Sequence, residues 1–338
     1  MKFIYIKTVI IILLLAFIYF IYKRLTYKVI ETFDFDMGQI MDVYPKYNIK
    51  IDIVKETLTK GNQTISYTNK FNSAMSRYFS KNKSEVNDLL EEHGIPVCKQ
   101  LSWDNTKDNS YNINKIKKEM SYPIVVKPRS GEKGKHVYTD IYNDEVLMKT
   151  ITLLQDSRKK DIIIEQQEPG EKYRIFILNQ TVIYIRKDSS PFVIGDGINT
   201  INKLIKKNND TEPLPVVYID KALIKRQGYN MDDVVEKNKK IIISNVAGAS
   251  NGSRLKIVDN SEVNKTNMKM FIDASKLLKL NNCGIDYITK DISIPYNIQG
   301  KIIEINSSPG FVRPVSIFDD EKLINRLVDA LFKPKLYN

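Results

Sequence analysis

Residues 122–137 read YPIVVKPRSGEKGKHV, an apolar run typical of a β-strand that ends in Lys127 and a polar loop. The loop holds Ser130, Gly131 and Gly134, and glycine allows backbone N–H groups to approach an anion closely. Because a lysine beside such a loop can neutralise a polyphosphate, the stretch predicts a nucleotide-phosphate site. The simpler interpretation is that Lys127 is the first exposed residue after a strand and that the glycines belong to an ordinary turn.

A second apolar strand pattern, KIIEINSSPG at residues 301–310, carries Glu304 and Asn306 two positions apart. Side chains two apart on a strand point to the same face, and oxygen ligands on one face can bind Mg²⁺. A carboxylate within such a run is also costly to bury without a cation. Together the two stretches indicate an enzyme that uses ATP and Mg²⁺. In the competing interpretation, Glu304 pairs with a lysine.

The composition limits the possible partners. Of 338 residues, 52 are Lys or Arg and 40 are Asp or Glu, a net charge of +12 that is spread along the sequence. Nucleic-acid-binding proteins usually concentrate positive charge and interleave aromatic residues. We therefore expect anionic nucleotides, acidic substrates or a lipid surface as partners, and no nucleic acid. The isolated Cys98 and Cys283 predict buried or unreactive thiols in a reducing compartment.

The N-terminus is predicted to enter a membrane. The run from Phe3 to Tyr22 reaches the length of about 20 residues that a bilayer requires if Lys7 snorkels to the surface. A cleaved signal peptide is the alternative, but no small-residue cleavage site follows the run. We expect a single-pass transmembrane anchor over residues 1–23. The positive charges after it mildly favour a catalytic domain on the cytoplasmic side.

Alternating strand and helix patterns with antiparallel hairpins after the anchor predict an α+β or mixed α/β protein. We expect a separate juxtamembrane segment at 24–70, with strands at 47–54 and 64–68. A helix should then begin at a Ser84 cap and end at Gly94. The other expected helices cover residues 113–120, 146–154 and 268–278. The other expected strands cover 122–127, 136–141, 162–165, 173–178, 181–185, 285–288 and 302–305.

The motifs occur in an order that resembles the ATP-grasp carboxylate-amine ligases, from about residue 64 to residue 331. After the Lys127 loop come EQQEPGEKYR at 165–174, CGID at 283–286 and EINSSPG at 304–310. The stretch FVIGDGINTINKLI at 192–205 is most similar to the ATP-grasp domain of cyanophycin synthetases and bifunctional glutathione synthetases. The resemblance implies an ATP-grasp domain at 71–335, in which two α+β lobes grip ATP.

The resemblance also implies roles for individual residues. Lys127 would contact the ATP phosphates under the glycine loop, and Glu165 would line the adenine pocket. The Mg²⁺ (or Mn²⁺) ligands would be Asp286, Glu304 and Asn306.

In many relatives, an acidic residue just before the aromatic of the Gly-x-x-Tyr-Arg pattern binds the ribose. Here that position holds Lys172, so Glu168 or Glu171 would have to substitute. We also count Lys83 among the candidate nucleotide-binding residues. The candidate catalytic residues are three arginines expected to contact anions: Arg174, Arg254 and Arg313.

The implied activity is ATP- and Mg²⁺-dependent ligation of a carboxylate to an amine through an acylphosphate, which forms an amide or peptide-type bond. The substrates would be small molecules or peptides. We expect a ligase module on a membrane anchor, whose substrates need not be those of the enzymes it resembles. The alternative is a catalytically inactive, membrane-tethered scaffold that binds ATP.

Overall fold

The computed structural model describes residues 48–52, 55, 57–66, 72–129, 134–159, 161–211, 216, 218–248, 251–307, 309 and 321–333. The predicted anchor at 1–23 lies outside these residues, as do Ser130, Gly131 and Arg313. Within the described part of the chain, no helix combines the length and hydropathy needed to cross a membrane.

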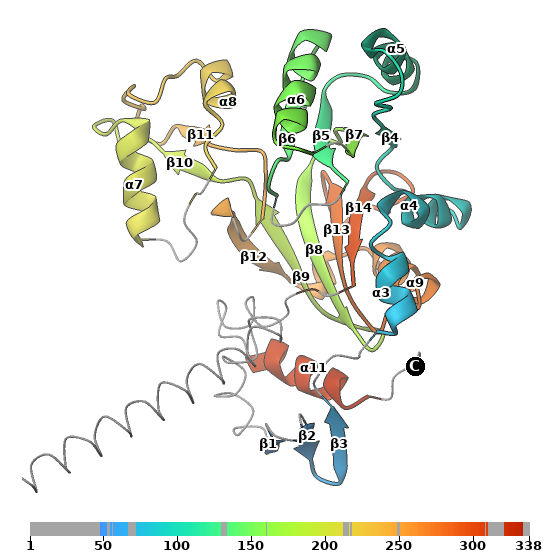
Figure 1. Ribbon diagram of the computed structural model, residues 1–338. Coiled ribbons are helices and arrows are strands. Elements are labelled where there is room, and N and C mark those ends of the chain that lie inside the picture. Colours follow the sequence, from blue (N-terminus) through green and yellow to red (C-terminus); the bar gives the residue numbers. More distant parts are fainter. Residues whose placement is uncertain are drawn as a thin grey trace, which may run out of the picture.

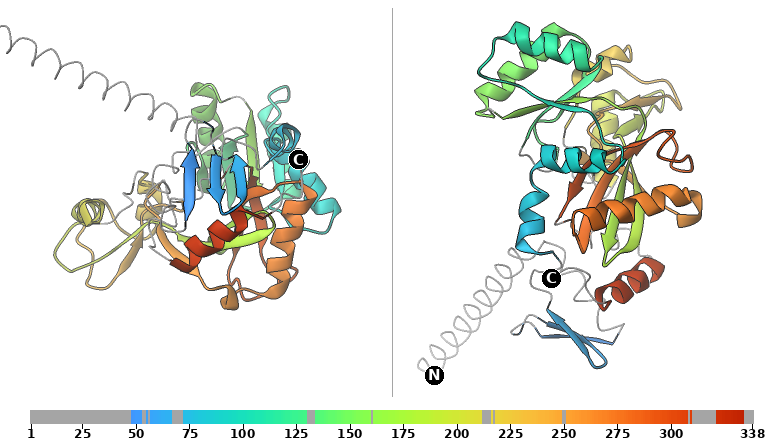
Figure 2. Two further views of the ribbon diagram at one scale, coloured as in Figure 1. Left: turned by 90° about the horizontal axis from the view of Figure 1, so that it is seen from below. Right: turned by 90° about the vertical axis from the view of Figure 1, so that its right-hand side faces the viewer.

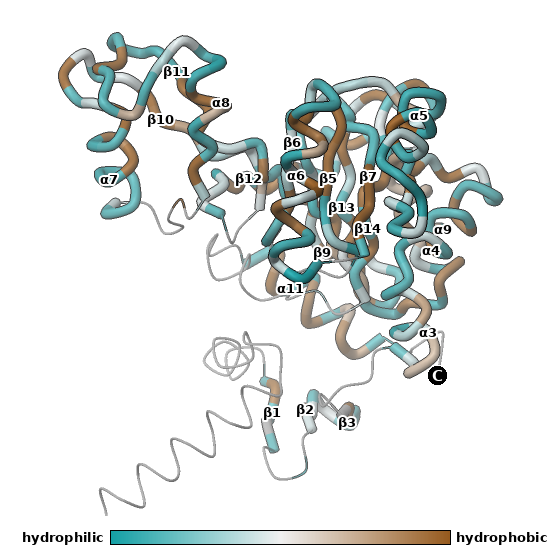
Figure 3. Tube along the Cα trace, turned by 45° about the horizontal axis from the view of Figure 1, so that its top comes forward, coloured by the Kyte–Doolittle hydropathy of each residue, from teal (hydrophilic) through white to brown (hydrophobic). Residues whose placement is uncertain are grey.

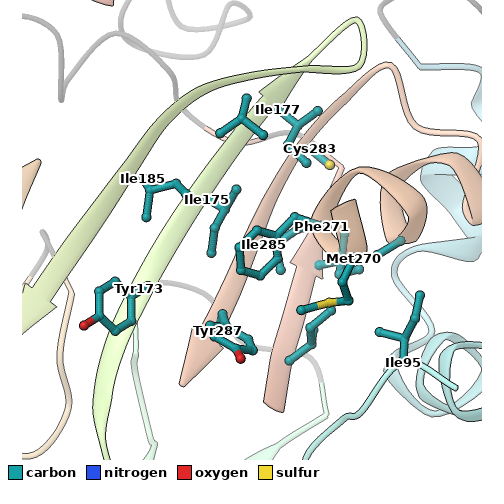
Figure 4. Close-up of a cluster of buried hydrophobic side chains, with 14 of the residues drawn as sticks. Ile95, Tyr173, Ile175, Ile177, Ile185, Met270, Phe271, Cys283, Ile285 and Tyr287 are labelled. Atoms are coloured by element: carbon teal, nitrogen blue, oxygen red, sulfur yellow. The ribbon is translucent and has the colours of Figure 1, made fainter. Parts of the chain in front are cut away.

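A five-stranded antiparallel sheet forms the centre of the molecule (Figure 1). Its strands, in spatial order, are β12 (Arg254–Val258), β9 (Thr181–Ser189), β8 (Glu171–Leu178), β13 (Asn282–Thr289) and β14 (Lys301–Asn306). Helix α9 (Lys265–Leu277) covers one face, where Ile175, Ile285 and Phe271 belong to a fully buried core (Figure 4). Because side chains alternate along a strand, the residues between these apolar positions project to the opposite face.

A second, four-stranded antiparallel sheet lies above the first in Figure 1. Its order is β4 (Gln100–Ser102), β7 (Ile162–Gln166), β5 (Ile124–Pro128) and β6 (Tyr138–Ile141). One face packs against α5 (Asn109–Glu119) and α6 (Asp144–Asp156), where Ile124, Val126 and Ile164 are buried. Lys127 and Glu165 alternate with those residues, so they lie on the other face.

The two sheets are joined where the chain leaves α4 (Lys83–Glu92). The N–H of Cys98 donates to the carbonyl of Ile302 at 3.0 Å, and the N–H of Ile302 donates to the carbonyl of Pro96 at 2.9 Å. The segment therefore pairs with the edge of β14 before it enters the second sheet as β4. A short helix, α3 (Ala74–Phe79), precedes α4.

An insertion between β9 and β12 has a small core of its own (Figure 3). It comprises β10 (Phe192–Ile194), α7 (Ile201–Thr211), α8 (Lys221–Arg226) and β11 (Lys240–Ile242). The short 3₁₀ helix η3 (Asn260–Glu262) follows β12.

A three-stranded sheet of β1 (Ile49–Asp52), β2 (Thr57–Lys60) and β3 (Gln63–Ser66) lies against α11 (Glu321–Leu331), as both views of Figure 2 show. Ile49 and Leu58 of this sheet share one buried cluster with α11 and with Phe176 of β8. The three-stranded sheet thus packs onto the five-stranded sheet through α11.

The α+β class and most of the expected elements are confirmed, including the β8–β9 hairpin and the adjacent β13 and β14. The expected cap of α4 is wrong: the helix begins at Lys83 after Asn82, and no side chain caps it. The hydroxyl of Ser84 instead accepts a hydrogen bond from the Arg129 guanidinium. Helix α5 begins earlier than expected because Asp108 caps it through the N–H of Tyr111.

Candidate nucleotide and metal site

The register of the large sheet brings the candidate metal ligands together. Asp286 on β13 lies opposite Glu304 on β14 and opposite Arg174 on β8. Directly paired residues of an antiparallel sheet share a face, and Asn306, two positions beyond Glu304, shares it too. The acidic cluster, as we name Asp286, Glu304 and Asn306, therefore lies on the face opposite α9.

Both carboxylate oxygens of Asp286 are bound by cations. Nη1 of Arg174 lies 2.6 Å from Oδ1, and Nζ of Lys172 lies 2.8 Å from Oδ2. Burial alone would raise the pKa of Asp286, but the charges of Lys172 and Arg174 outweigh it and hold the pKa well below its usual range. Asp286 is thus ionised and paired within the protein itself.

Glu304 and Asn306 extend this pairing across the sheet. Nζ of Lys83 lies 3.3 Å from Oε2 of Glu304. With its amide oriented to satisfy both neighbours, Asn306 donates to Oε1 of Glu304 at 2.7 Å and accepts from Nη1 of Arg174 at 3.0 Å. The pairing of Glu304 with a lysine is therefore observed. Asp286 lies within β13, which ends at Thr289.

Gly284 makes room for the arginine. It lies opposite Asn306 in the ladder, and a Cβ built on it would be 2.4 Å from Nη2 of Arg174 and 2.5 Å from Cζ. A larger residue would displace the guanidinium from its place across β13. The motif containing Gly284 was visible in the sequence, but its steric role depends on the strand pairing.

Lys127 forms a second buried pair on the smaller sheet. Its side chain is 8% exposed, and Nζ donates to Oε2 of Glu165 at 2.7 Å. Burial lowers the pKa of Lys127, but the carboxylates of Glu165 and Glu304 more than compensate and raise it. The interpretation of Lys127 as the first exposed residue after a strand is therefore wrong. The influence of Glu304 also shows that the two sheets contribute to one charged region.

Gln100 is a contributor that sequence reasoning missed. Its Nε2 donates to the same Oε2 of Glu165 at 2.6 Å, and its Oε1 is buried with no hydrogen-bond partner among the described residues. Nothing in the local pattern marks Gln100. It is found only because β4 pairs with β7 at this position.

Other candidates lie at the edges of this region. Glu168 pairs with Lys301 at 2.7 Å, and Glu171 lies 3.6 Å from Nζ of Lys187. The guanidinium of Arg254 lies over the ring of Phe192, 4.2 Å from its centroid, which connects β12 to the insertion.

Gly134 is the last glycine of the predicted phosphate loop and has a φ of 70°. A Cβ built on it would be 2.8 Å from Cγ1 of Val246, so the end of the loop packs closely on the segment after β11. Both predicted thiols, Cys98 and Cys283, are free and buried. Burial raises the pKa of each.

The donor set of the acidic cluster suits Mg²⁺. Two carboxylates and one amide oxygen are hard ligands, and they lie on adjacent positions of two paired strands. In the described ranges, no three or more His, Cys, Asp and Glu side chains are placed to hold a metal. The amide of Asn306 is therefore needed as a third ligand. Because cations already bind both carboxylates, a metal would have to displace them.

No protein-family model matches this chain. It is 28% identical over 242 residues to cyanophycin synthetase of Synechocystis sp., covering 68% of this chain and 27% of that protein. It is 27% identical over 256 residues to the glutathione biosynthesis bifunctional protein of Streptococcus mutans, covering 68% and 32%. The chain thus spans about a quarter to a third of the length of these relatives.

A solved structure gives the same class of fold. The bifunctional glutathione synthetase from Pasteurella multocida superposes with a TM-score of 0.53 at 18% identity, over 84% of this chain and 42% of that one. The ATP-grasp fold is therefore confirmed. The sequence relatives confirm the resemblance to the ATP-grasp carboxylate-amine ligases, and the chain is a homologue of these carbon–nitrogen bond-forming enzymes.

Proposed function

We propose that this protein is an ATP-grasp ligase that uses ATP and Mg²⁺ or Mn²⁺ to join a carboxylate to an amine. The observation that carries the proposal is the pairing of Asp286 with Glu304 on one sheet face, where lysine and arginine side chains contact both carboxylates. Two carboxylates among lysines and arginines can bind a metal and a polyphosphate together.

The proposal assigns a role in binding the nucleotide or the metal to each of these residues. Lys127 binds the nucleotide phosphates, and Lys83, at the first turn of α4, adds a second charge. Mg²⁺ held by Asp286, Glu304 and Asn306 would offset the negative charge of the phosphates. Arg174 holds Asp286 and Asn306 in place and presents its charge on the face where the phosphates would lie.

In the proposed reaction, a substrate carboxylate oxygen attacks the γ-phosphorus of ATP and the bond to ADP breaks. The product is an acylphosphate. An amine nitrogen then attacks the acyl carbon, the C–O bond to phosphate breaks, and the nitrogen loses a proton. Neither step needs a protein nucleophile, so positioning and charge stabilisation supply most of the rate. The substrates are proposed to be small molecules or peptides.

The test is ADP release by the full-length protein, in detergent, from ATP and Mg²⁺ with mixtures of amino acids or peptides. Hydroxylamine should convert an acylphosphate to a hydroxamate that mass spectrometry identifies, and this product should name the carboxylate. Glu304→Gln serves as the matched control. If the parent binds ATP but releases no more ADP than Glu304→Gln, the inactive scaffold is the correct alternative.

We also propose that residues 1–23 anchor the protein in a membrane with the ligase domain on the cytoplasmic side. The support is the apolar run from Phe3 to Tyr22. The native protein should stay in the membrane fraction after high salt, and a variant without residues 1–23 should not. N-terminal sequencing that began after residue 22 would establish a cleaved signal peptide instead.

A further inference from the structure

Lys172 is a charged group of this region to which the proposed ligase mechanism assigns no role. It lies on β8 two positions before Arg174, so both side chains share the face of the acidic cluster. Nζ of Lys172 is 2.8 Å from Oδ2 of Asp286, and its side chain is 24% exposed. Lys172 therefore holds a carboxylate that the proposed function assigns to the metal.

The pairing places Lys172 in competition with a metal. Arg174 pairs with Oδ1 of Asp286 and Lys172 pairs with Oδ2, so both oxygens have a cationic partner. A divalent ion that approached Oδ2 would meet an ammonium within a few ångströms, and like charges at such separations repel strongly in a partly buried site. A metal can therefore bind Asp286 only if Lys172 moves away.

A second contact indicates where the ammonium can go. Nζ of Lys172 also donates to the carbonyl of Ala247 at 3.3 Å. The neighbouring Val246 is the residue against which Gly134 packs at the end of the predicted phosphate loop. Lys172 thus contacts both Asp286 and the segment that packs against Gly134, where a bound polyphosphate would offer it a new partner.

We propose that Lys172 is a built-in counter-cation that blocks Asp286 from divalent metal until an anionic ligand draws the ammonium away. It is a positioning residue, and the inference rests on the proposed ATP and metal site. Metal that binds alone must break the ion pair between Lys172 and Asp286 and leave the ammonium without a partner. Nucleotide that binds Lys172 alone must break the same pair and leave the carboxylate without a partner. Bound together, metal and nucleotide exchange these partners, so each strengthens the binding of the other by the same factor.

The experiment measures two affinities of the full-length protein. Electron paramagnetic resonance follows Mn²⁺ binding without nucleotide, and calorimetry follows ATP binding in EDTA. Lys172→Met should tighten Mn²⁺ binding by about tenfold or more, because one nearby positive charge is removed. It should weaken metal-free ATP binding, because one phosphate partner is lost. A purely structural role would not move the two affinities in opposite directions.

Two variants serve as controls. Lys172→Arg keeps the charge and should retain the Mn²⁺ affinity of the parent. Lys269→Met removes a Lys–Asp pair of the same kind from the exposed face of α9 and should change neither affinity. Because Arg174 still pairs with Asp286, Lys172→Met should remain folded, which its melting temperature checks.

Unchanged or weaker Mn²⁺ binding by folded Lys172→Met would overturn the proposal, as would a failure of both parent and variant to bind Mn²⁺. Unchanged ATP affinity in EDTA would overturn the transfer of Lys172 to an anion. Neither measurement depends on turnover. A protein that showed both shifts but released no ADP would contradict the ligase function and leave the counter-cation in place.

Discussion

Asp286 and Glu304 stand directly opposite each other on β13 and β14, yet each carboxylate pairs with different cations. Lys172 and Arg174 hold Asp286, while Lys83 reaches Glu304 from α4. The protein's own side chains therefore supply the cation that a carboxylate in this strand needs. A metal becomes a competitor for these groups, which makes its binding dependent on what else occupies the site.

Glu304→Gln should nearly abolish ADP release, because it removes one of two carboxylates proposed to hold the metal. The stability cost should stay within about 1 kcal/mol, since the pair with Lys83 is partly solvated. ADP release at low Mg²⁺ and the ligand-free melting temperature measure the two effects, with Glu91→Gln on the exposed face of α4 as control. Normal ADP release, or a large fall in melting temperature, would make Glu304 a structural partner of Lys83.

Lys127→Met should destabilise the fold as well as weaken ATP binding. Strand periodicity places the residue at a strand end, where little cost is expected, but the structure buries it against Glu165. Loss of one partner of a buried ion pair costs about 3 kcal/mol, because the other charge is left unpaired. Urea unfolding should show this loss.

The double variant Lys127→Met/Glu165→Gln separates the two effects. It removes the unpaired charge, so much of the stability should return, while ATP affinity measured by calorimetry should stay low. The exposed Lys118→Met should change neither quantity. A single Lys127→Met variant with ATP affinity equal to that of the parent would contradict the phosphate assignment.

Asp140→Asn should loosen the insertion. The buried carboxylate of Asp140 accepts from Nη2 of Arg226 at 3.0 Å and from Nδ2 of Asn245 at 2.6 Å, which joins β6 to the insertion. Removal of the charge weakens both hydrogen bonds and should lower the local stability by about 1–3 kcal/mol. Amide exchange around α8 should therefore accelerate about fivefold or more. Hydrogen–deuterium exchange measures this, with α9 as internal reference.

Asp210→Asn, an exposed change on α7, is the matched control for that experiment. Equal exchange around α8 in the parent and Asp140→Asn would mean that the apolar core of the insertion fixes its position without this carboxylate.

The turn before α7 should show an acid-sensitive contribution to stability. The N–H groups of Asn199 and Ile198 and the amide of Asn199 donate to Asp196 and lower its pKa to about 2. A depressed carboxyl pKa stabilises the fold above the ordinary value of 3.8, and this stabilisation is lost as the pH falls through about 2. Carboxyl ¹³C NMR should give a midpoint near 2, and one near 4 would contradict these hydrogen bonds.

Much of the chain could be predicted from local patterns. The apolar run Ile302–Ile305 indicated β14, and the helical spacing of Phe271 and Ala274 indicated α9. The helix prediction succeeded because a period-3.6 pattern reflects which face of a helix is buried. In β14, Ile302 and Ile305 belong to one buried core although they are three positions apart, because the pairing with β13 shifts in register between them. The predicted cap of α4 was wrong because the hydroxyl of Ser84 accepts a hydrogen bond from Arg129, which is 45 residues away in the chain.

The α+β class, the order of the motifs and the same-face placement of Glu304 and Asn306 could be predicted from the sequence, because each rests on a periodicity or a motif that is a few residues long. The charged partners of these side chains, in contrast, follow from contacts between distant parts of the chain. Arg174 meets Asp286 across 112 residues because β8 and β13 pair in one register, and a shift of one residue would turn the cluster to the opposite face. Charge pairing therefore followed from strand register, which no local pattern contains.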